Sequence, residues 1–94
     1  MELPLVDGCR LDPAARADQA HRWRLVGSRA RVLIAQPRRL VVELALDIDM
    51  TLVERALAIE RGCCPQFELA LDGRRLTVAT ADEPALAALA AAFS

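Results

Sequence analysis

Three cysteines have the most evident chemical capacity in this sequence, and two of them are adjacent. Cys63 and Cys64 stand in the stretch ERGCCPQ, and Cys9 stands in VDGCRLDP. A disulfide within the pair would be strained, because successive Cα atoms lie about 3.8 Å apart and disulfides join Cα atoms about 4.4–6.8 Å apart. Separate thiols are therefore expected, and these can bind soft metals, be oxidised or pack as small hydrophobes.

The backbone at the pair decides whether both thiols can reach one ion. In a regular strand, neighbouring side chains point to opposite faces. In a turn they can converge, and Gly62 and Pro65 on either side favour a turn. The packing alternative stays open, because each cysteine also continues an apolar stripe of the preceding helix. Those stripes are Leu52, Ala56, Ile59 and Cys63, and Val53, Leu57, Glu60 and Cys64.

Spacing and neighbours exclude several other thiol chemistries. The chain has no C-x-x-C, so neither a thioredoxin-like dithiol nor a zinc ribbon is expected. His21, the only histidine, falls on the apolar stripe of the first helix and is expected to be partly buried instead of acting as a ligand or base. No general base or oxyanion arrangement accompanies the thiols, so we do not expect an enzyme. Glu60 on an inner stripe needs a hydrogen-bond partner, or lies beside the thiols.

Length and composition predict one folded domain over residues 1–94. The chain is 54% hydrophobic and 27% charged, with a net charge of −1, and arginines alternate with acids. A nucleic-acid binder usually has a concentrated basic stripe, so no nucleic acid is expected as a partner. All twelve basic residues are arginine, which suggests a GC-rich bacterial genome. The stretch MELPLVDG lacks the features of a signal peptide. The longest uncharged apolar run, PALAALAAAF, has about half of the ~20 residues that a membrane-spanning helix needs. Both observations predict a cytoplasmic protein without membrane contact.

The elements that must position the cysteines follow from caps and periodicity. Asp12 and Pro13 predict a helix that runs to about Val26, with Gly27 as its stop. Its expected inner stripe is Ala17, His21 and Leu25, widened by Ala20 and Trp23. RVLIAQ and RRLVVELAL predict a hairpin that turns at Pro37-Arg38, with Leu40, Val42, Leu44 and Leu46 on one face.

The second half repeats this organisation, although not its residues. DMTLVERALAIERG predicts a helix with Thr51 and Glu54 as a capping box and Gly62 as a left-handed stop. QFELAL and RRLTVAT flank Asp72-Gly73, which is typical of a type I′ hairpin turn. A final helix is expected to start near Asp82 and Pro84. Its apolar stripe comprises Leu86, Leu89, Ala90 and Phe93.

Together these elements predict an α+β fold of order α-ββ-α-ββ-α. Two hairpins join as a four-stranded antiparallel sheet, and the helices cover one of its faces. The open face would carry a set of small apolar residues, which predicts a homodimer. These are Val41, Ala45, Ala70 and Ala79.

The sequence also resembles a known group of proteins. Four features in order are similar to those of small, mostly uncharacterised bacterial proteins. They are C-R-L-D-P, a helix with Trp23, A-I-E-R-G-C-C-P and a final L-A-A-L helix. That group carries an early cysteine and a later E-x-x-C-C-P motif and is loosely associated with heavy-metal handling. The resemblance covers nearly the whole chain and departs at Gln66, where the group has an aromatic residue. It implies that Cys9 belongs with the pair.

Two hypotheses of function follow. The first is a small thiolate-based binding protein for a soft metal or metalloid ion, namely zinc, Cu(I), Hg(II) or trivalent arsenic. Cys9, Cys63 and Cys64 would bind the ion, with Glu60 and Arg61 behind them. The second is a non-catalytic, dimeric interaction module or thiol redox sensor, in which Cys9 resolves an oxidised partner of the pair.

Overall fold

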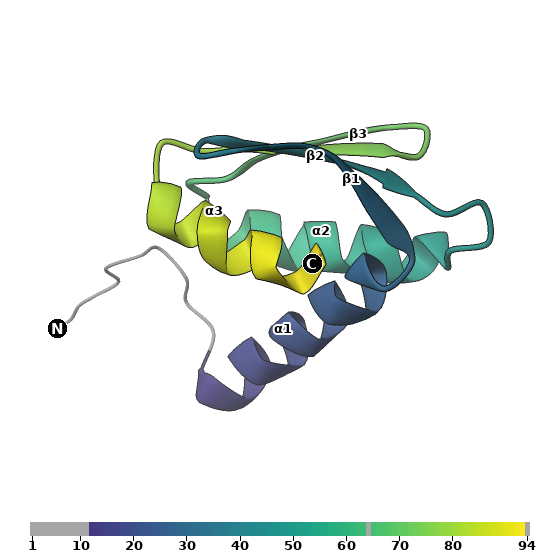
Figure 1. Cartoon of the computed structure of the whole chain (residues 1–94). Coiled ribbons are helices and arrows are strands. Elements are labelled where there is room, and N and C mark those ends of the chain that lie inside the picture. Colours follow the sequence, from purple (N-terminus) through teal and green to yellow (C-terminus); the bar gives the residue numbers. More distant parts are fainter. Residues whose placement is uncertain (1–11, 64, 94) are drawn as a thin grey trace, which may run out of the picture.

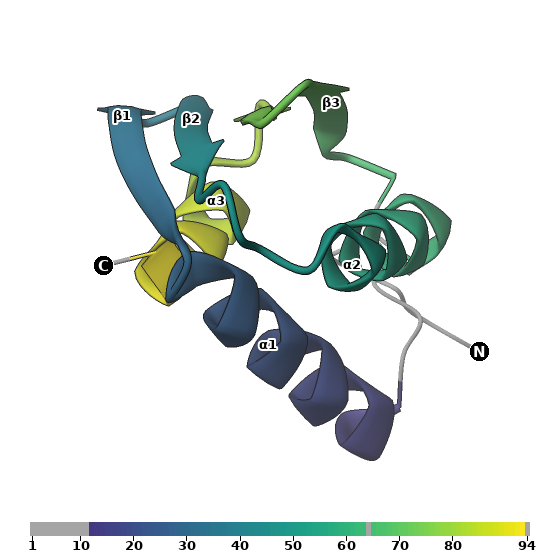
Figure 2. The same cartoon turned by 90° about the vertical axis from the view of Figure 1, so that its right-hand side faces the viewer.

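The computed structural model describes residues 12–63 and 65–93 and confirms the predicted α+β fold (Figure 1). In chain order the elements are α1 (Pro13–Gly27), β1 (Ala30–Gln36), β2 (Arg39–Leu44), α2 (Met50–Cys63), β3 (Glu68–Asp72), β4 (Arg75–Ala79), α3 (Glu83–Ala90) and a short 3₁₀ helix, η1 (Ala91–Phe93). The sheet is antiparallel in the order β1-β2-β4-β3. All three α-helices lie on the same side of it, as Figures 1 and 2 show.

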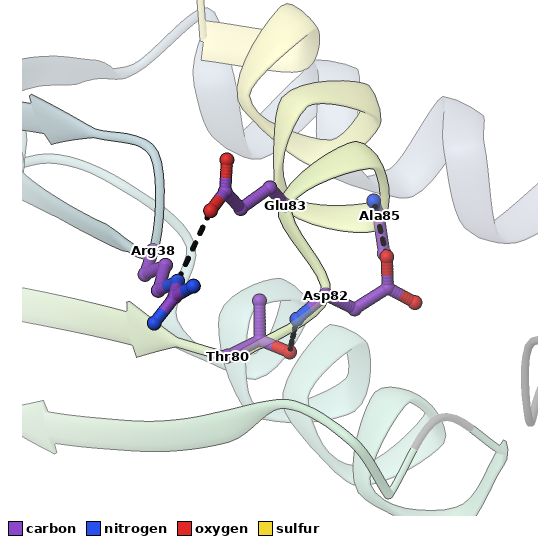
Figure 3. Close-up of polar contacts among 5 residues, drawn as sticks. All are labelled: Arg38, Thr80, Asp82, Glu83 and Ala85. Carbon is purple, nitrogen blue, oxygen red and sulfur yellow. Dashed lines mark hydrogen bonds and ion pairs between the residues drawn. The ribbon is translucent and has the colours of Figure 1, made fainter.

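Aspartates begin the first and last helices, as predicted. The Asp12 carboxylate accepts a hydrogen bond from the Ala15 backbone N–H at 2.8 Å, and Asp82 accepts one from Ala85 at 3.1 Å (Figure 3). Such caps satisfy donors that a helix leaves open at its first turn. Glu83 also pairs with Arg38 at 3.1 Å, which ties the start of α3 to the β1–β2 turn (Figure 3).

The bounds predicted for α2 hold to within one residue, but both of its predicted caps were wrong. Asp49 accepts a hydrogen bond from the Thr51 N–H at 3.0 Å, so the cap is Asp49, two residues before the expected capping box. Gly62 lies within the helix, which continues to Cys63. Among the described residues only Gly73 has a positive φ, so Gly62 is not the left-handed stop that the sequence suggested.

The second hairpin is confirmed, but its turn is displaced by one residue. Asp72 pairs with Arg75, so the two central turn residues are Gly73 and Arg74. Gly73 has φ +62°, whereas Arg74 is not among the residues with positive φ. A positive φ at the first central position alone is the pattern of a type II′ turn, not type I′.

The repeat extends to the residues of the hairpins, contrary to the expectation from the sequence. LIAQPRRLVV (33–42) and LALDGRRLTV (69–78) have identical residues at five of ten positions, 36 residues apart. Their registers also match near the turn: Ile34 pairs with Val41, as Ala70 pairs with Thr77. One residue further from the turn, a bulge at Leu33 interrupts the pairing of β1 with β2. Where β2 meets β4, Val41 lies directly opposite Thr77, its counterpart in the other copy. The two hairpins are therefore related by an approximate twofold axis between these residues.

The core fills the space between the sheet and the helices. Leu40, Val42 and Leu44 of β2 point inward, as predicted, and Leu76 and Val78 do the same from β4. Leu46, predicted to continue this face, lies beyond the end of β2 and is 82% exposed. The helices supply the rest of the core. Their buried apolar residues are Trp23, Val26, Val53, Ala56, Leu57, Cys63, Leu86, Leu89 and, in η1, Phe93.

The open face of the sheet is more polar and better packed than expected. Val41 is only 3% exposed, because it lies in a central strand between Ile34 and Thr77. One row of charges of alternating sign crosses all four strands, and opposite charges in neighbouring strands stabilise a sheet. Its members are Arg31, Glu43, Arg75 and Asp72.

Candidate functional site

Cys63 is the last residue of α2, and its side chain faces the core. It is 5% exposed and belongs to the main cluster of buried residues. Residues 65 and 66 form a turn immediately beyond it. Cys9 and Cys64 lie outside the described residues, so the predicted grouping of the three thiols stays a prediction.

Glu60, one turn before Cys63, is a buried carboxylate that joins α2 to α1. Its Oε1 atom accepts hydrogen bonds from Trp23 Nε1 at 2.6 Å and from Gln19 Nε2 at 3.0 Å. Glu60 and Gln19 are each 5% exposed, and Trp23 is 3% exposed. Trp23 and Glu60, two residues on which the family resemblance depends, are therefore direct partners.

Gln19 is fully engaged in this network. Its amide nitrogen also donates to the carbonyl oxygen of Ala56 at 2.9 Å, and its oxygen accepts from Arg22 Nη1 at 2.6 Å. The chain of contacts therefore runs from a half-buried guanidinium through an amide to the Glu60 carboxylate. Because buried polar groups are costly unless hydrogen-bonded, this network fixes how α1 crosses α2.

Arg61 lies on a different side of α2 from Glu60. Its side chain is exposed, and Nη2 donates to the Leu69 carbonyl oxygen at 3.0 Å. It therefore attaches the end of α2 to β3. The two residues predicted to stand together behind a thiol site thus hold α2 to two different elements.

The predicted inner face of α1 was right for Trp23 and wrong for its other residues. Ala17, His21 and Leu25 are all exposed, and the buried residues are Gln19, Trp23 and Val26. The expected partly buried imidazole of His21 is therefore a surface group. Apolar residues occur all around this helix, so their spacing could not select a face. Two polar residues would have indicated the buried face better. Gln19 and Glu60 each lie at helical spacing from the buried apolar residues of their own helix.

Within residues 12–63 and 65–93, no three His, Cys, Asp or Glu side chains converge as metal ligands would. Two of the three predicted ligands lie outside these ranges, so the observation concerns only the part of the chain they cover. In the same ranges, none of the helices combines the length and hydropathy that crossing a membrane requires.

Comparison of the chain with protein families, curated proteins and solved structures gives no match. The resemblance to the E-x-x-C-C-P group therefore remains a prediction from the residues. The chemistry open to the site follows from its own geometry.

Proposed function

We propose that the protein binds a soft metal or metalloid ion through cysteine thiolates, with Cys63 and Cys64 as ligands and Cys9 as the third. The observation that carries the proposal is that Cys63 ends a helix and that residues 65 and 66 form a turn. At such a junction, consecutive side chains are not held on opposite faces as they are in a strand. Thiolates are soft ligands that suit zinc, Cu(I) and Hg(II), and three of them also suit trivalent arsenic.

In this proposal the residues around Cys63 hold the end of α2 in place. Glu60 fixes it to α1, and Arg61 fixes it to β3. Both act through the backbone of α2 and not on the ion. The protein works in the cytoplasm, where thiols stay reduced, and assembles as a homodimer through the open face of its sheet. It carries out no catalysis.

The test is binding of trivalent arsenic or zinc by reduced protein in excess glutathione. The wild type should bind one ion per chain, and binding should tighten as pH rises, because thiols lose protons when they bind metal. Cys63→Ser and Cys64→Ser should each weaken binding severely. Ala58→Ser, at an exposed position of the same helix, is the matched control and should bind as the wild type does. Cys9→Ser separates a three-thiolate site from a pair.

The same experiment can refute the proposal. If the wild type binds neither ion under these conditions, and both serine variants unfold at the wild-type temperature, the cysteines are not a metal site. Since Cys63 is buried, the unfolding temperature without ion must be measured for each variant. That measurement separates lost ligation from lost packing.

The place of Cys63 in the apolar core favours a second function, a non-catalytic interaction module in which this cysteine is a packing residue. A redox sensor is a variant of this function, in which a peroxide would oxidise one thiolate of the pair to a sulfenic acid. The Cys9 thiol would then condense with it, forming a disulfide and releasing water. Mass spectrometry after peroxide treatment would show a loss of two hydrogens per chain that Cys9→Ser abolishes.

A further inference from the structure

An apolar-walled cavity lies where α1, α2 and α3 meet. It has a volume of ≈ 390 Å³, which is within the usual range of about 300–1,000 Å³ for small-molecule sites. Its walls are mostly apolar and come from all three helices and from the segment before β3. They include Ala20, Trp23, Phe67, Ala88, Leu89 and Ala92. Cys63, the described member of the proposed thiol site, is not among the lining residues.

Glu60 lines this cavity with a carboxylate that no arginine of the described residues pairs with. Its two hydrogen-bond donors, Trp23 Nε1 and Gln19 Nε2, are both neutral and both act on Oε1. Arginines elsewhere in the described ranges pair with other acids, namely Asp47, Glu43 and Glu83. A buried carboxylate is costly unless it is directly paired, and a cationic group in the cavity would offset that cost.

Positive charge occurs among the same lining residues but on exposed side chains. Arg16 and Arg24 both line the cavity from α1, and both are exposed to solvent. The cavity therefore has a negative group in its buried part, apolar walls, and guanidinium groups at its surface. A simple organic cation would meet the Arg24 guanidinium unfavourably on entry, whereas a simple anion would meet Glu60.

We propose that this cavity binds a small zwitterion with an apolar body, whose ammonium group reaches Glu60 and whose carboxylate stays at Arg24. Each part of the cavity then has a complementary part of the ligand. The ammonium group supplies donors to the second oxygen of the Glu60 carboxylate. The apolar body displaces water from the alanine and aromatic walls.

The test compares three linear probes of similar length: 6-aminohexanoate, hexylamine and hexanoate. Trp23 is the only tryptophan in the chain and lines the cavity, so its fluorescence reports binding directly. The zwitterion should bind most tightly, hexylamine next and hexanoate least. Glu60→Gln keeps the size of the side chain and should weaken 6-aminohexanoate about tenfold or more, the effect of losing one charged hydrogen bond.

Two further variants, each with a control variant, keep the proposal testable if Glu60→Gln does not fold. Ala88→Leu should fill the cavity and abolish binding of all probes, whereas Ala87→Leu, one residue away and lining a different cavity, should not. Arg24→Gln should weaken 6-aminohexanoate but not hexylamine, and Arg55→Gln, on the exposed part of α2, should change neither. Equal binding of hexanoate and the zwitterion, or binding that survives Ala88→Leu, would overturn the proposal.

Discussion

Gly27, the last residue of α1, lies directly against the backbone of Ala92 in η1. A Cβ atom at Gly27 would overlap the Ala92 carbonyl oxygen and crowd the Phe93 Cα. The obstacle is backbone, so no side chain can rotate away to make room. This close approach lets the C-terminal residues pack under α1, where the rings of Phe93 and Trp23 lie 6.0 Å apart.

We therefore expect Gly27→Ala to be strongly destabilising. Forcing extra volume into a packed site costs about 1–3 kcal/mol, and a backbone obstacle places this change at the upper end. For a domain of this size that lowers the unfolding temperature by more than about 10 °C. Thermal unfolding followed by circular dichroism would measure it. An unfolding temperature within about 2 °C of the wild type would show that α1 and η1 are not in contact.

Gly62→Ala should have the opposite effect. Gly62 lies within α2, its φ is not positive, and no atom lies within 4 Å of the position that a Cβ would take. Alanine in a helix is more stable than glycine by roughly 0.5–1 kcal/mol. Chemical denaturation should show that gain in the free energy of unfolding, while its slope against denaturant concentration stays the same. A loss of stability would restore the sequence prediction that Gly62 ends the helix in a left-handed conformation.

Gly73→Val should destabilise the second hairpin. The φ of +62° at Gly73 is one that β-branched residues resist, at a cost of about 1–3 kcal/mol. Gly73→Asn is the matched control, because asparagine tolerates a left-handed backbone far better. The Gly73→Val variant should therefore unfold at a clearly lower temperature than the Gly73→Asn variant. Two variants of equal stability would mean that the turn does not need a positive φ.

Trp23→Phe should weaken the contact between α1 and α2. It removes the indole N–H that donates to Glu60, leaving a buried acceptor less satisfied, which costs about 1–3 kcal/mol. In a Glu60→Gln background the same change should cost less, because the charged acceptor is already gone. Equilibrium denaturation of the four proteins gives this difference directly. Equal costs in both backgrounds would show that the charge of Glu60 adds nothing to this hydrogen bond.

Ala70→Glu should disrupt the proposed homodimer. Ala70 is exposed on the open face beside Thr77, and a carboxylate there would repel its counterpart and resist burial. Sedimentation velocity should find a dimer for the wild type and a 10.2 kDa monomer for the variant. Ala58→Glu, on exposed α2, is the control. A wild type that stays monomeric at high concentration would contradict the proposed homodimer.

Much of the fold could be predicted because it depends on local signals. Asp12, Asp82 and the alternating strands each act within a few residues, and each predicted its element correctly. The face of α1 could not be predicted the same way. It depends on a hydrogen bond between Trp23 and Glu60, 37 residues apart, which no local periodicity encodes. The predicted position of the turn was wrong by one residue for a related reason. The pairing of Asp72 with Arg75, and not the Asp-Gly pair alone, decides which two residues are central in the turn.

The candidate site was predicted only in part. Burial of Glu60 followed from its helical stripe, but its partners did not, because Gln19 lies on a face of α1 that spacing alone could not select. Arg61 next to it in sequence contacts β3, since neighbouring helical residues point about 100° apart. Adjacency in the sequence was therefore a poor guide to shared function in this helix.

The pairing of Val41 with Thr77 across the middle of the sheet has a consequence for how such a chain could arise. Each residue faces its own counterpart, so one hairpin sequence supplies both sides of the central strand contact. A half-length chain with one copy could form the same contact with a second molecule, as a symmetric pair. Duplication and fusion of its gene would then join the two strands covalently. The bulge at Leu33, which interrupts the β1 pairing of the first hairpin but has no equivalent in the second, would record divergence after that event.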